Sequence, residues 1–294
     1  MGKGIVRQMF EQLYLAIVHA IPPRWYFVFE LHDDDKRQKA GQYLQRFETK
    51  GGIYTLLKER RPREAPLSPL ANKVEFASWC HEHQVPAVPA LMALKGGRIT
   101  YCGGCELTLP PIDLFVKPTR GKGGRGAERW DYQPSGSYQG ADGTMLPGVE
   151  VLHRLKTLAF AEGCLVQPRV VNHPSIADLS TGALVTVRIM TCRNEQGEIE
   201  VTNAVLRRAR KGNTVVDNFH AGGIAAKVDL HSGELGRATD QGISATTGWC
   251  NTHPDTGAQI LGRRLPLWPE ALDLVQRAHA VFSDRIYSDG MSLC

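Results

Sequence analysis

The chain has 294 residues, of which 42% are apolar and 22% charged, and it carries 35 basic against 30 acidic residues. This is ordinary globular composition, which excludes a disordered or fibrous protein, and the length favours two or three folded units. The net charge of +5 suits phosphate-bearing ligands without requiring nucleic acid. Seven cysteines without framework spacing exclude a disulfide scaffold and favour a reduced, cytoplasmic protein.

The N-terminal region is predicted to be mainly helical. Residues 5–20 predict an amphipathic helix that packs on the body of the protein and ends at a proline pair. The apolar run 13–21 within it is too short to span a bilayer, and no signal-peptide cleavage site follows it directly. Residues 25–31 form either a strand or a buried helical turn, and residues 33–48 predict a polar helix.

A segment rich in proline and charge, residues 60–69, is interpreted as a linker. Beyond it, Asn72 caps a predicted helix over 72–83, and Gly96-Gly97 turns a predicted hairpin. Further elements follow in an order typical of a mixed α+β chain. They are strand 114–117, helix 149–162, strand 164–167, the paired strands 184–191 and 198–206, strand 224–230 and helix 269–282.

The segment 113–127 carries the strongest chemical signal. A short strand ends in Lys117, and a loop with four glycines and three further basic residues follows. Glycines allow backbone N–H groups to close on phosphate oxygens because no Cβ blocks the approach. The segment matches neither the P-loop pattern nor the dinucleotide-binding glycine pattern. Taken alone, it is a phosphate cradle, a solvated basic loop, or an RNA-contacting stretch at 120–129.

Three later segments extend this signal: Leu165-Val-Gln-Pro168, Thr186-Val-Arg188 and Asp217-Asn-Phe-His-Ala-Gly-Gly223. With the Phe-Val-Lys-Pro strand and its glycine loop, this order resembles the ATP-grasp superfamily, and within it the sugar-transfer-associated branch. The resemblance covers most of the chain. It implies an α+β ATP-grasp fold in which two subdomains clamp ATP between two sheets. The expected regions are a helical part at 1–70, a lid subdomain at 71–166 and a C-terminal subdomain, incomplete at its end, at 167–294.

The resemblance also assigns site residues. Lys117 matches the lysine that contacts the ATP phosphates. The loop that folds over the phosphates is matched by Gly123, Gly124 and Gly126. The hinge whose backbone reads adenine is matched by Val166, Gln167 and Pro168. Arg188 matches an arginine near the transferred phosphate, and Asn218 resembles an asparagine of glutamate-adding ligases, so both are expected to be catalytic. Asp178 is a weak candidate for holding the ribose. Either Arg207 or Arg208 is expected to add positive charge.

The family reaction accounts for these residue types. A carboxylate attacks the γ-phosphoryl group of ATP, and an amine intercepts the resulting acylphosphate. Cationic side chains, backbone amides and Mg²⁺ offset the repulsion between the two anions. We therefore expect an ATP-dependent carboxylate–amine ligase that acts on a carboxylate-bearing and an amine-bearing substrate in polysaccharide or cell-surface glycan modification. The alternatives are a non-catalytic nucleotide-binding protein and an RNA-binding module that uses residues 120–129.

The family pattern breaks after Phe282. The strands expected next carry Gly-Trp-Asp-Val-Ala and Glu-x-Asn, whose carboxylates hold Mg²⁺, and neither follows in this sequence. The final Asp289-Gly-Met-Ser-Leu-Cys294 can be encoded by bases that read Trp-Asp-Val-Ala-Leu in another frame. We therefore expect a truncated or frameshifted member that lacks its metal ligands, which leaves open whether it is an active enzyme. Asp217 and Asp229 are weak substitute ligands.

Cysteine and histidine give only smaller signals. Cys102 and Cys105, together with Cys80 and His83, are the residue types of a zinc site. Free thiols at a hairpin turn are the favoured interpretation. Cys250 has no histidine or aspartate at a spacing that indicates a nucleophile.

Overall fold

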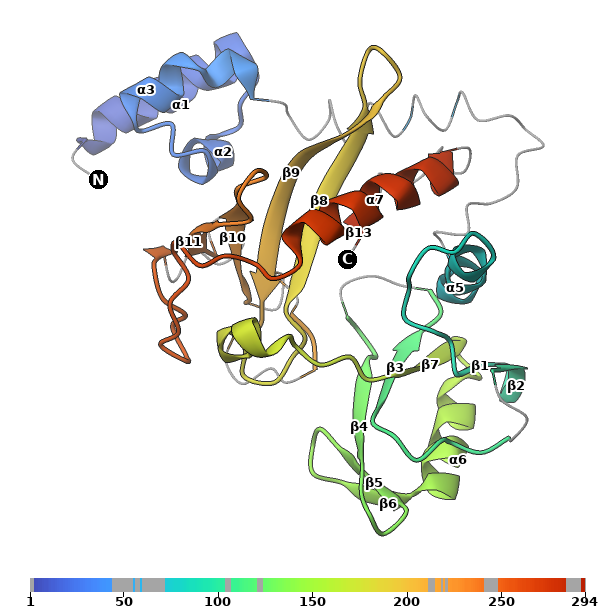
Figure 1. Ribbon diagram of the computed structural model, residues 1–294. Helices are drawn as coiled ribbons and strands as arrows, with labels where there is room; N and C mark the ends of the chain where they lie inside the picture. The colour runs from blue at the N-terminus through green and yellow to red at the C-terminus, as the bar shows by residue number, and fades with distance from the viewer. Residues whose placement is uncertain are drawn as a thin grey trace.

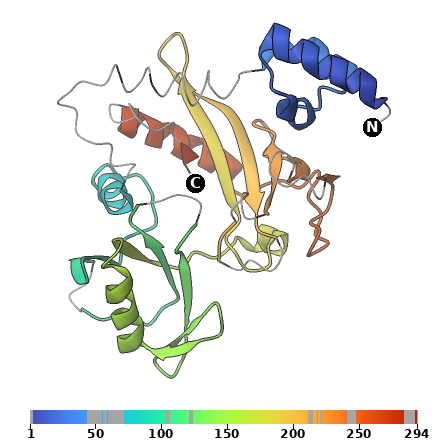
Figure 2. The same ribbon diagram turned by 180° about the vertical axis from the view of Figure 1, so that it is seen from behind.

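The computed structural model describes residues 3–43, 55, 59, 72–103, 107–120, 124–210, 215–217, 219, 222–240, 248–283 and 292–293. It arranges them as a helical N-terminal unit and two antiparallel sheets, each with a helix on one face (Figures 1 and 2). Gly123, Asn218 and the segment 284–291 lie outside the described residues, so the structure does not place them.

The N-terminal unit comprises α1 (Ile5–His19), α2 (Pro23–Val28), α3 (Asp34–Gln38) and the 3₁₀-helix η1 (Ala40–Gln42). Its small core joins one buried leucine of α1 to residues of α2, η1 and the connections on either side of α2: Leu15, Ile21, Tyr26, Leu31 and Ala40. The segment 25–31 is therefore mainly helical. The expectation that α1 packs its apolar face on the body of the protein fails for most of that face, because Leu15 is the only α1 residue that is buried.

The first sheet has seven strands in the order β2-β1-β7-β3-β4-β5-β6. Its strands are β1 (Met92–Lys95), β2 (Arg98–Cys102), β3 (Leu114–Pro118), β4 (Glu128–Tyr132), β5 (Ser137–Gly140), β6 (Met145–Pro147) and β7 (Cys164–Pro168). Helix α6 (Gly148–Leu158) covers one face, where its Val151 and Leu155 pack against Leu114, Val116 and Trp130. The side chains of β3 and β7 that alternate with these lie on the opposite face, where those of Leu165 and Gln167 are buried and those of Phe115 and Lys117 are partly exposed.

The second sheet has six strands in the order β12-β11-β10-β9-β8-β13. They are β8 (Thr186–Arg193), β9 (Ile199–Arg208), β10 (Ile224–Val228), β11 (Leu235–Thr239), β12 (Trp249–Cys250) and β13 (Ser292–Leu293). Helix α7 (Trp268–Phe282) and the 3₁₀-helix η4 (Pro174–Leu179) pack on one face through Trp268, Val275 and Leu179. The side chains on the other face point away from this core.

Contacts between described residues join the units. Helix α5 (Lys73–Glu82) packs on the end of α7 through Cys80, Val85, Ala278 and Phe282, and the rings of Phe76 and Phe282 stack with centroids 5.3 Å apart. Gly124 of the glycine-rich loop lies against Val216 of the second sheet unit. Trp249 of β12 donates a 2.6 Å hydrogen bond from Nε1 to Glu30 Oε1 of the N-terminal unit.

Candidate functional site

Lys117 and Gln167 lie on the same face of the seven-stranded sheet, the one turned away from α6. In β3, Leu114 and Val116 are buried against α6, so the alternation of side chains turns Phe115 and Lys117 to the other face. The pairing of β3 with β7 sets Phe115 opposite Gln167 and Lys117 opposite Leu165. The two predicted nucleotide residues are therefore diagonal neighbours near the end of β3.

The predicted adenine hinge is partly occupied by contacts within the sheet. The Val166 side chain is in the core, and its carbonyl accepts a 2.9 Å hydrogen bond from Leu91 N. The buried Gln167 side chain donates from Nε2 to the Val88 carbonyl at 2.7 Å. Pro168 lies at the strand end opposite Leu114. An adenine-reading role thus remains a prediction that falls on the backbone of Gln167 and Pro168.

The glycine-rich loop requires glycine at its two described positions. Gly124 and Gly126 have φ values of +71° and +69°, which L side chains rarely adopt. A Cβ at Gly126 would lie 3.2 Å from Pro118 Cγ, so the loop folds back on the end of β3. A Cβ at Gly124 would lie 2.8 Å from Val216 Cγ1. The loop therefore bridges the Lys117 side of the site and the segment 215–217.

Val216 is followed by an aspartate that is tied to the open face of the second sheet. Asp217 is buried, and its carboxylate accepts a hydrogen bond from the Thr186 hydroxyl. Arg207 Nη2 donates to Asp217 Oδ1 at 2.9 Å and to Thr186 Oγ1 at 3.4 Å. Asp217 therefore fixes Arg207 on the sheet next to the glycine-rich loop.

Arg188 lies on the same face as Arg207. Thr186 pairs with Arg207, and Arg188 pairs with Val205, so the two arginines are diagonal neighbours roughly 7 Å apart at their backbones. Lys227 is opposite Val205 on the other side and adds a third cation to this face. These three cations make the part of this face around Val205 positive, with Asp217 paired to Arg207 beside it.

Arg208 takes no part in this face. It follows Arg207 in β9, so its side chain turns to the core side together with Ala204 and Leu206, and it is fully buried. Burial lowers the pKa of Arg208 to about 10. Of the two arginines, only Arg207 shares a face with Arg188, so the predicted contribution of positive charge falls on Arg207.

One basic residue near the loop was not predicted from the sequence. Lys73 begins α5, and its backbone N–H donates to the Thr119 carbonyl at 3.1 Å, two residues after Lys117. Burial lowers the pKa of Lys73, and the charge of Glu162 opposes that shift. The Asn72 cap predicted the start of α5, but no sequence signal indicated that this helix begins beside β3.

The weaker candidate residues have structural partners. Asp178 accepts a 2.8 Å hydrogen bond from Arg263 Nη1. Asp229 accepts from the backbone N–H groups of His231 and Ser232 and so holds a turn. Among the described residues, no group of three or more His, Cys, Asp or Glu side chains is placed to hold a metal ion. Cys80 is buried between α5 and α7, and Cys105 is not described.

Two solved structures resemble the chain. One is the crystal structure of N5-carboxyaminoimidazole synthetase from Staphylococcus aureus complexed with ADP, at a TM-score of 0.36 and 10% identity, with 85% of this chain and 49% of that one covered. The other is D-cycloserine synthetase DcsG, at a TM-score of 0.33 and 11% identity, with coverages of 90% and 80%. The chain thus spans about half the length of the first structure.

A search of curated proteins found no match. The model of the sugar-transfer associated ATP-grasp family matches residues 56–291, which is most of the chain. This match and the two mixed α+β units confirm the fold class predicted from the sequence. The chain therefore belongs to the sugar-transfer associated ATP-grasp family.

Proposed function

We propose that this protein binds ATP with the phosphates between Lys117, the glycine-rich loop and the Arg188–Arg207 face. The observation that supports the proposal most is the contact of Gly124 with Val216, next to the Asp217–Arg207 pair. This contact brings cations from two sheets to one loop whose glycines leave backbone N–H groups accessible. A polyphosphate is the ligand whose charge and length fit such an arrangement.

The proposed reaction is ligation of a carboxylate to an amine. A carboxylate oxygen attacks the γ-phosphorus, the bond to the β-phosphate oxygen breaks, and ADP leaves. The amine nitrogen then attacks the acyl carbon, and inorganic phosphate leaves as the amide forms. Arg188 and Arg207 neutralise the approaching anions, and Asp217 holds Arg207 in place, so that less reorganisation is needed in the transition state.

Mg²⁺ is the usual companion of ATP, but the described residues do not fit a magnesium site. Magnesium needs oxygen ligands in octahedral geometry. Asp217 is engaged by Arg207 and Thr186, and Asp229 is engaged in its turn. We therefore assign no metal ligand among the described residues and route no step of the proposed reaction through a metal.

The substrate class is proposed from the family description alone. The family's name associates it with sugar transfer, which favours a carboxylate or an amine carried on a glycan or its precursor. A non-catalytic nucleotide-binding protein is the second candidate, and the lack of a carboxylate cluster among the described residues favours it.

An RNA-binding role of the basic loop is weakened, because Trp130 is buried and Arg129 is paired with Asp131.

Calorimetric titration with Mg·ATP tests the proposal. We expect binding by the wild type, at least a tenfold loss in Lys117→Ala because a charge-assisted contact is removed, and little change in Lys95→Ala. Lys95 is an exposed lysine of the same sheet and serves as the matched control. Absence of ATP binding by the folded wild type would falsify the proposal. Binding without ADP release in the presence of candidate acids and amines would support the non-catalytic candidate.

A further inference from the structure

Helix α1 carries a broad apolar face that no described residue covers. The face consists of two rows with a spacing of four residues. The rows are Ile5, Met9, Leu13 and Ile17, and Val6, Phe10, Tyr14 and Val18. Every one of these eight side chains is between 54% and 76% exposed. The helix instead buries Leu15 on its other side, against Ile21, Tyr26, Leu31 and Ala40 of its own unit.

The exposed face is large for a protein that acts as a monomer. Since a large side chain contributes roughly 150–200 Å² when free, the eight residues expose on the order of 1,000 Å² together. The largest apolar patch of a typical monomer is about 300–600 Å². A standard protein interface buries about 800 Å² from each partner. The apolar surface of α1 is therefore of the size that a stable dimer needs.

The shape of the face suits another helix of the same kind. Side chains four residues apart form ridges, and two adjacent ridges leave a groove between them. The ridges of one helix fit the grooves of an identical helix, and this is the commonest helix packing in globular proteins. Neither row contains a charged residue. Two copies can therefore meet across a two-fold axis without like charges facing each other.

The charges at the margin of the face disfavour a lipid surface. A helix that lies on a membrane usually presents free Lys and Arg side chains to anionic headgroups. Here Lys3 pairs with Glu11 at 3.1 Å, and Arg7 pairs with Glu11 at 3.0 Å. Asp33 and Asp35 are exposed in the same unit and carry charges that anionic lipid repels, whereas Asp34 is paired with Lys3 and Arg37. None of the described helices is long and apolar enough to cross a membrane.

We propose that α1 pairs with α1 of a second copy of this chain to form a symmetric dimer. Figure 2 shows α1 on the outer side of the N-terminal unit, away from both sheets. A second copy seated there leaves the open faces of β3 and β8 uncovered. The proposal does not depend on ATP binding, so its failure and that of the proposed function are separable.

Sedimentation equilibrium over a range of concentrations tests the pairing. The wild type should sediment at twice the 32.5 kDa chain mass. The double variant Phe10→Gln, Leu13→Gln removes two apolar side chains from the centre of the face. Both side chains are more than half exposed, so the variant should fold and sediment as a monomer. The matched control Val149→Gln, Leu158→Gln alters two exposed apolar residues of α6 and should remain a dimer.

Three results would overturn the pairing. One is a wild type that stays monomeric at about 100 μM, well above the concentrations at which micromolar dimers form. Another is a double variant that stays a dimer with an unchanged circular dichroism spectrum. The third is a monomeric wild type that binds phosphatidylcholine or phosphatidylserine vesicles through Phe10 and Leu13, since that outcome assigns the face to lipid.

Discussion

Two consecutive arginines at the end of β9 have opposite environments. Arg207 reaches Asp217 and Thr186 on the open face, whereas Arg208 points into the core beside Cys250 and Arg263. None of the three guanidinium nitrogens of Arg208 has a hydrogen-bond partner among the residues that the structure describes. An unpaired charge in the interior costs free energy, because the lost hydration is not replaced.

We predict that Arg208→Met stabilises the fold. Methionine fills a similar volume without a charge to desolvate, so the free energy of unfolding should rise by about 1–3 kcal/mol. Urea unfolding at pH 7 measures the change. Arg207→Met is the matched comparison, since it should lower both stability and ATP affinity by breaking the pair with Asp217. A clear loss of stability in Arg208→Met would show instead that this arginine has a buried counter-charge.

Two glycines with similar φ values, one in the glycine-rich loop and one outside it, allow the effect of backbone strain to be separated from the effect of a lost contact. Gly124 and Gly136 have φ values of +71° and +81°, so alanine costs about 1–2 kcal/mol at either position. A Cβ at Gly136 meets nothing within 4 Å, whereas one at Gly124 lies 2.8 Å from Val216. We predict that Gly124→Ala weakens Mg·ATP binding in calorimetry and that Gly136→Ala does not. Equal Mg·ATP affinities in the two variants would mean that the glycine-rich loop is not part of the binding site.

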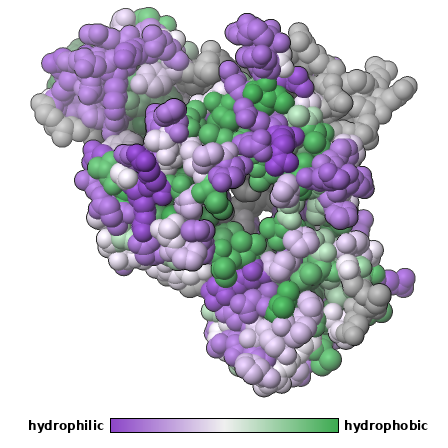
Figure 3. All heavy atoms as spheres, viewed as in Figure 1, coloured by the Kyte–Doolittle hydropathy of each residue, from purple (hydrophilic) through white to green (hydrophobic). Residues whose placement is uncertain are grey.

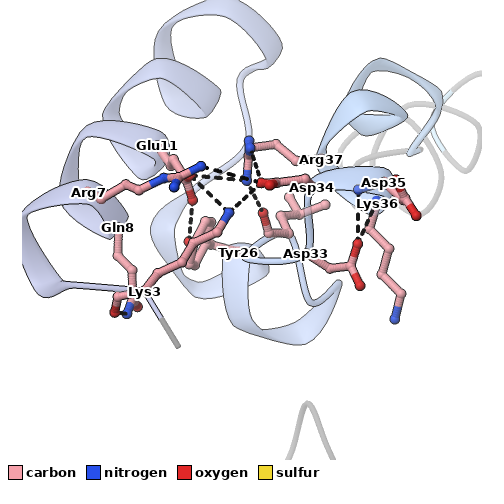
Figure 4. A network of polar contacts seen from close by, with 11 residues as sticks. Lys3, Arg7, Gln8, Glu11, Tyr26, Asp33, Asp34, Asp35, Lys36 and Arg37 are labelled. Atoms are coloured by element: carbon pink, nitrogen blue, oxygen red, sulfur yellow. Dashed lines mark hydrogen bonds and ion pairs between the residues drawn. The ribbon is translucent and has the colours of Figure 1, made fainter. Parts of the chain in front are cut away.

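At the scale of elements, the N-terminal helices are held by a network centred on Glu11 (Figure 4). Its carboxylate accepts from Tyr26 Oη at 2.7 Å and pairs with Lys3, Arg7 and Arg37. Burial by itself raises the pKa of Glu11, but these donors outweigh it, and the pKa lies below its ordinary value of 4.5. The carboxylate thus favours the folded unit only when it is ionised.

The sign of this shift predicts acid sensitivity of α1, α2 and α3. Because the folded pKa lies below the unfolded one, the stabilisation is complete above about pH 4.5 and is lost as the pH falls through the folded pKa. Amide hydrogen exchange of the three helices, corrected for intrinsic rates, should show lower protection at pH 3.5 than at pH 7. In Glu11→Gln the protection should already be lower at pH 7 and change less with pH. A wild-type profile as flat as the variant's would contradict the assignment.

The sequence predicted the elements whose signals are local. The Asn72 cap, whose Oδ1 accepts from Val74 N at 3.0 Å, and the Gly96-Gly97 turn, with both φ values positive, lie where they were expected. Strand β4 was missed because only Trp130 of its five residues is buried. Its charges are paired within the fold, as in the bond from Arg154 Nη2 to Glu128 Oε1 at 2.8 Å, and such pairing cannot be read locally.

For the site residues, too, the sequence predicted only what local signals or the family resemblance could indicate. The family resemblance pointed to Lys117 and Gln167. Once the pairing of β3 with β7 is known, the alternation of side chains along each strand puts both residues on one face of the sheet. The choice between Arg207 and Arg208 required knowing which face α7 covers, which depends on residues some seventy positions later. Val216 had no chemical signal in the sequence, because its contact with Gly124 exists only once two sheets are in place.

At the scale of the whole molecule, the residues of the proposed site come from two different sheets. Lys117 and Gln167 belong to the seven-stranded sheet, and Arg188 and Arg207 belong to the six-stranded one. The α5–α7 cluster and the Gly124–Val216 contact join these units, and Figure 3 shows an opening in the surface between α7 and β3. A polyphosphate that touches both halves adds a third connection between the units.

This arrangement predicts that ATP slows hydrogen exchange on both sheets together. A ligand that contacts both halves stabilises the joined form by its own binding free energy, so amides of β3, β8 and β9 should all gain protection at saturating ATP. Lys117→Ala should lose the gain in β8 and β9 as well as in β3, although the mutation lies in only one sheet. Strand β2, at the edge of the seven-stranded sheet, serves as an internal reference, and the protection of its amides should not change. Protection of a single sheet, or protection that persists in β8 and β9 of the variant, would mean that the two halves bind separately and that no nucleotide spans them.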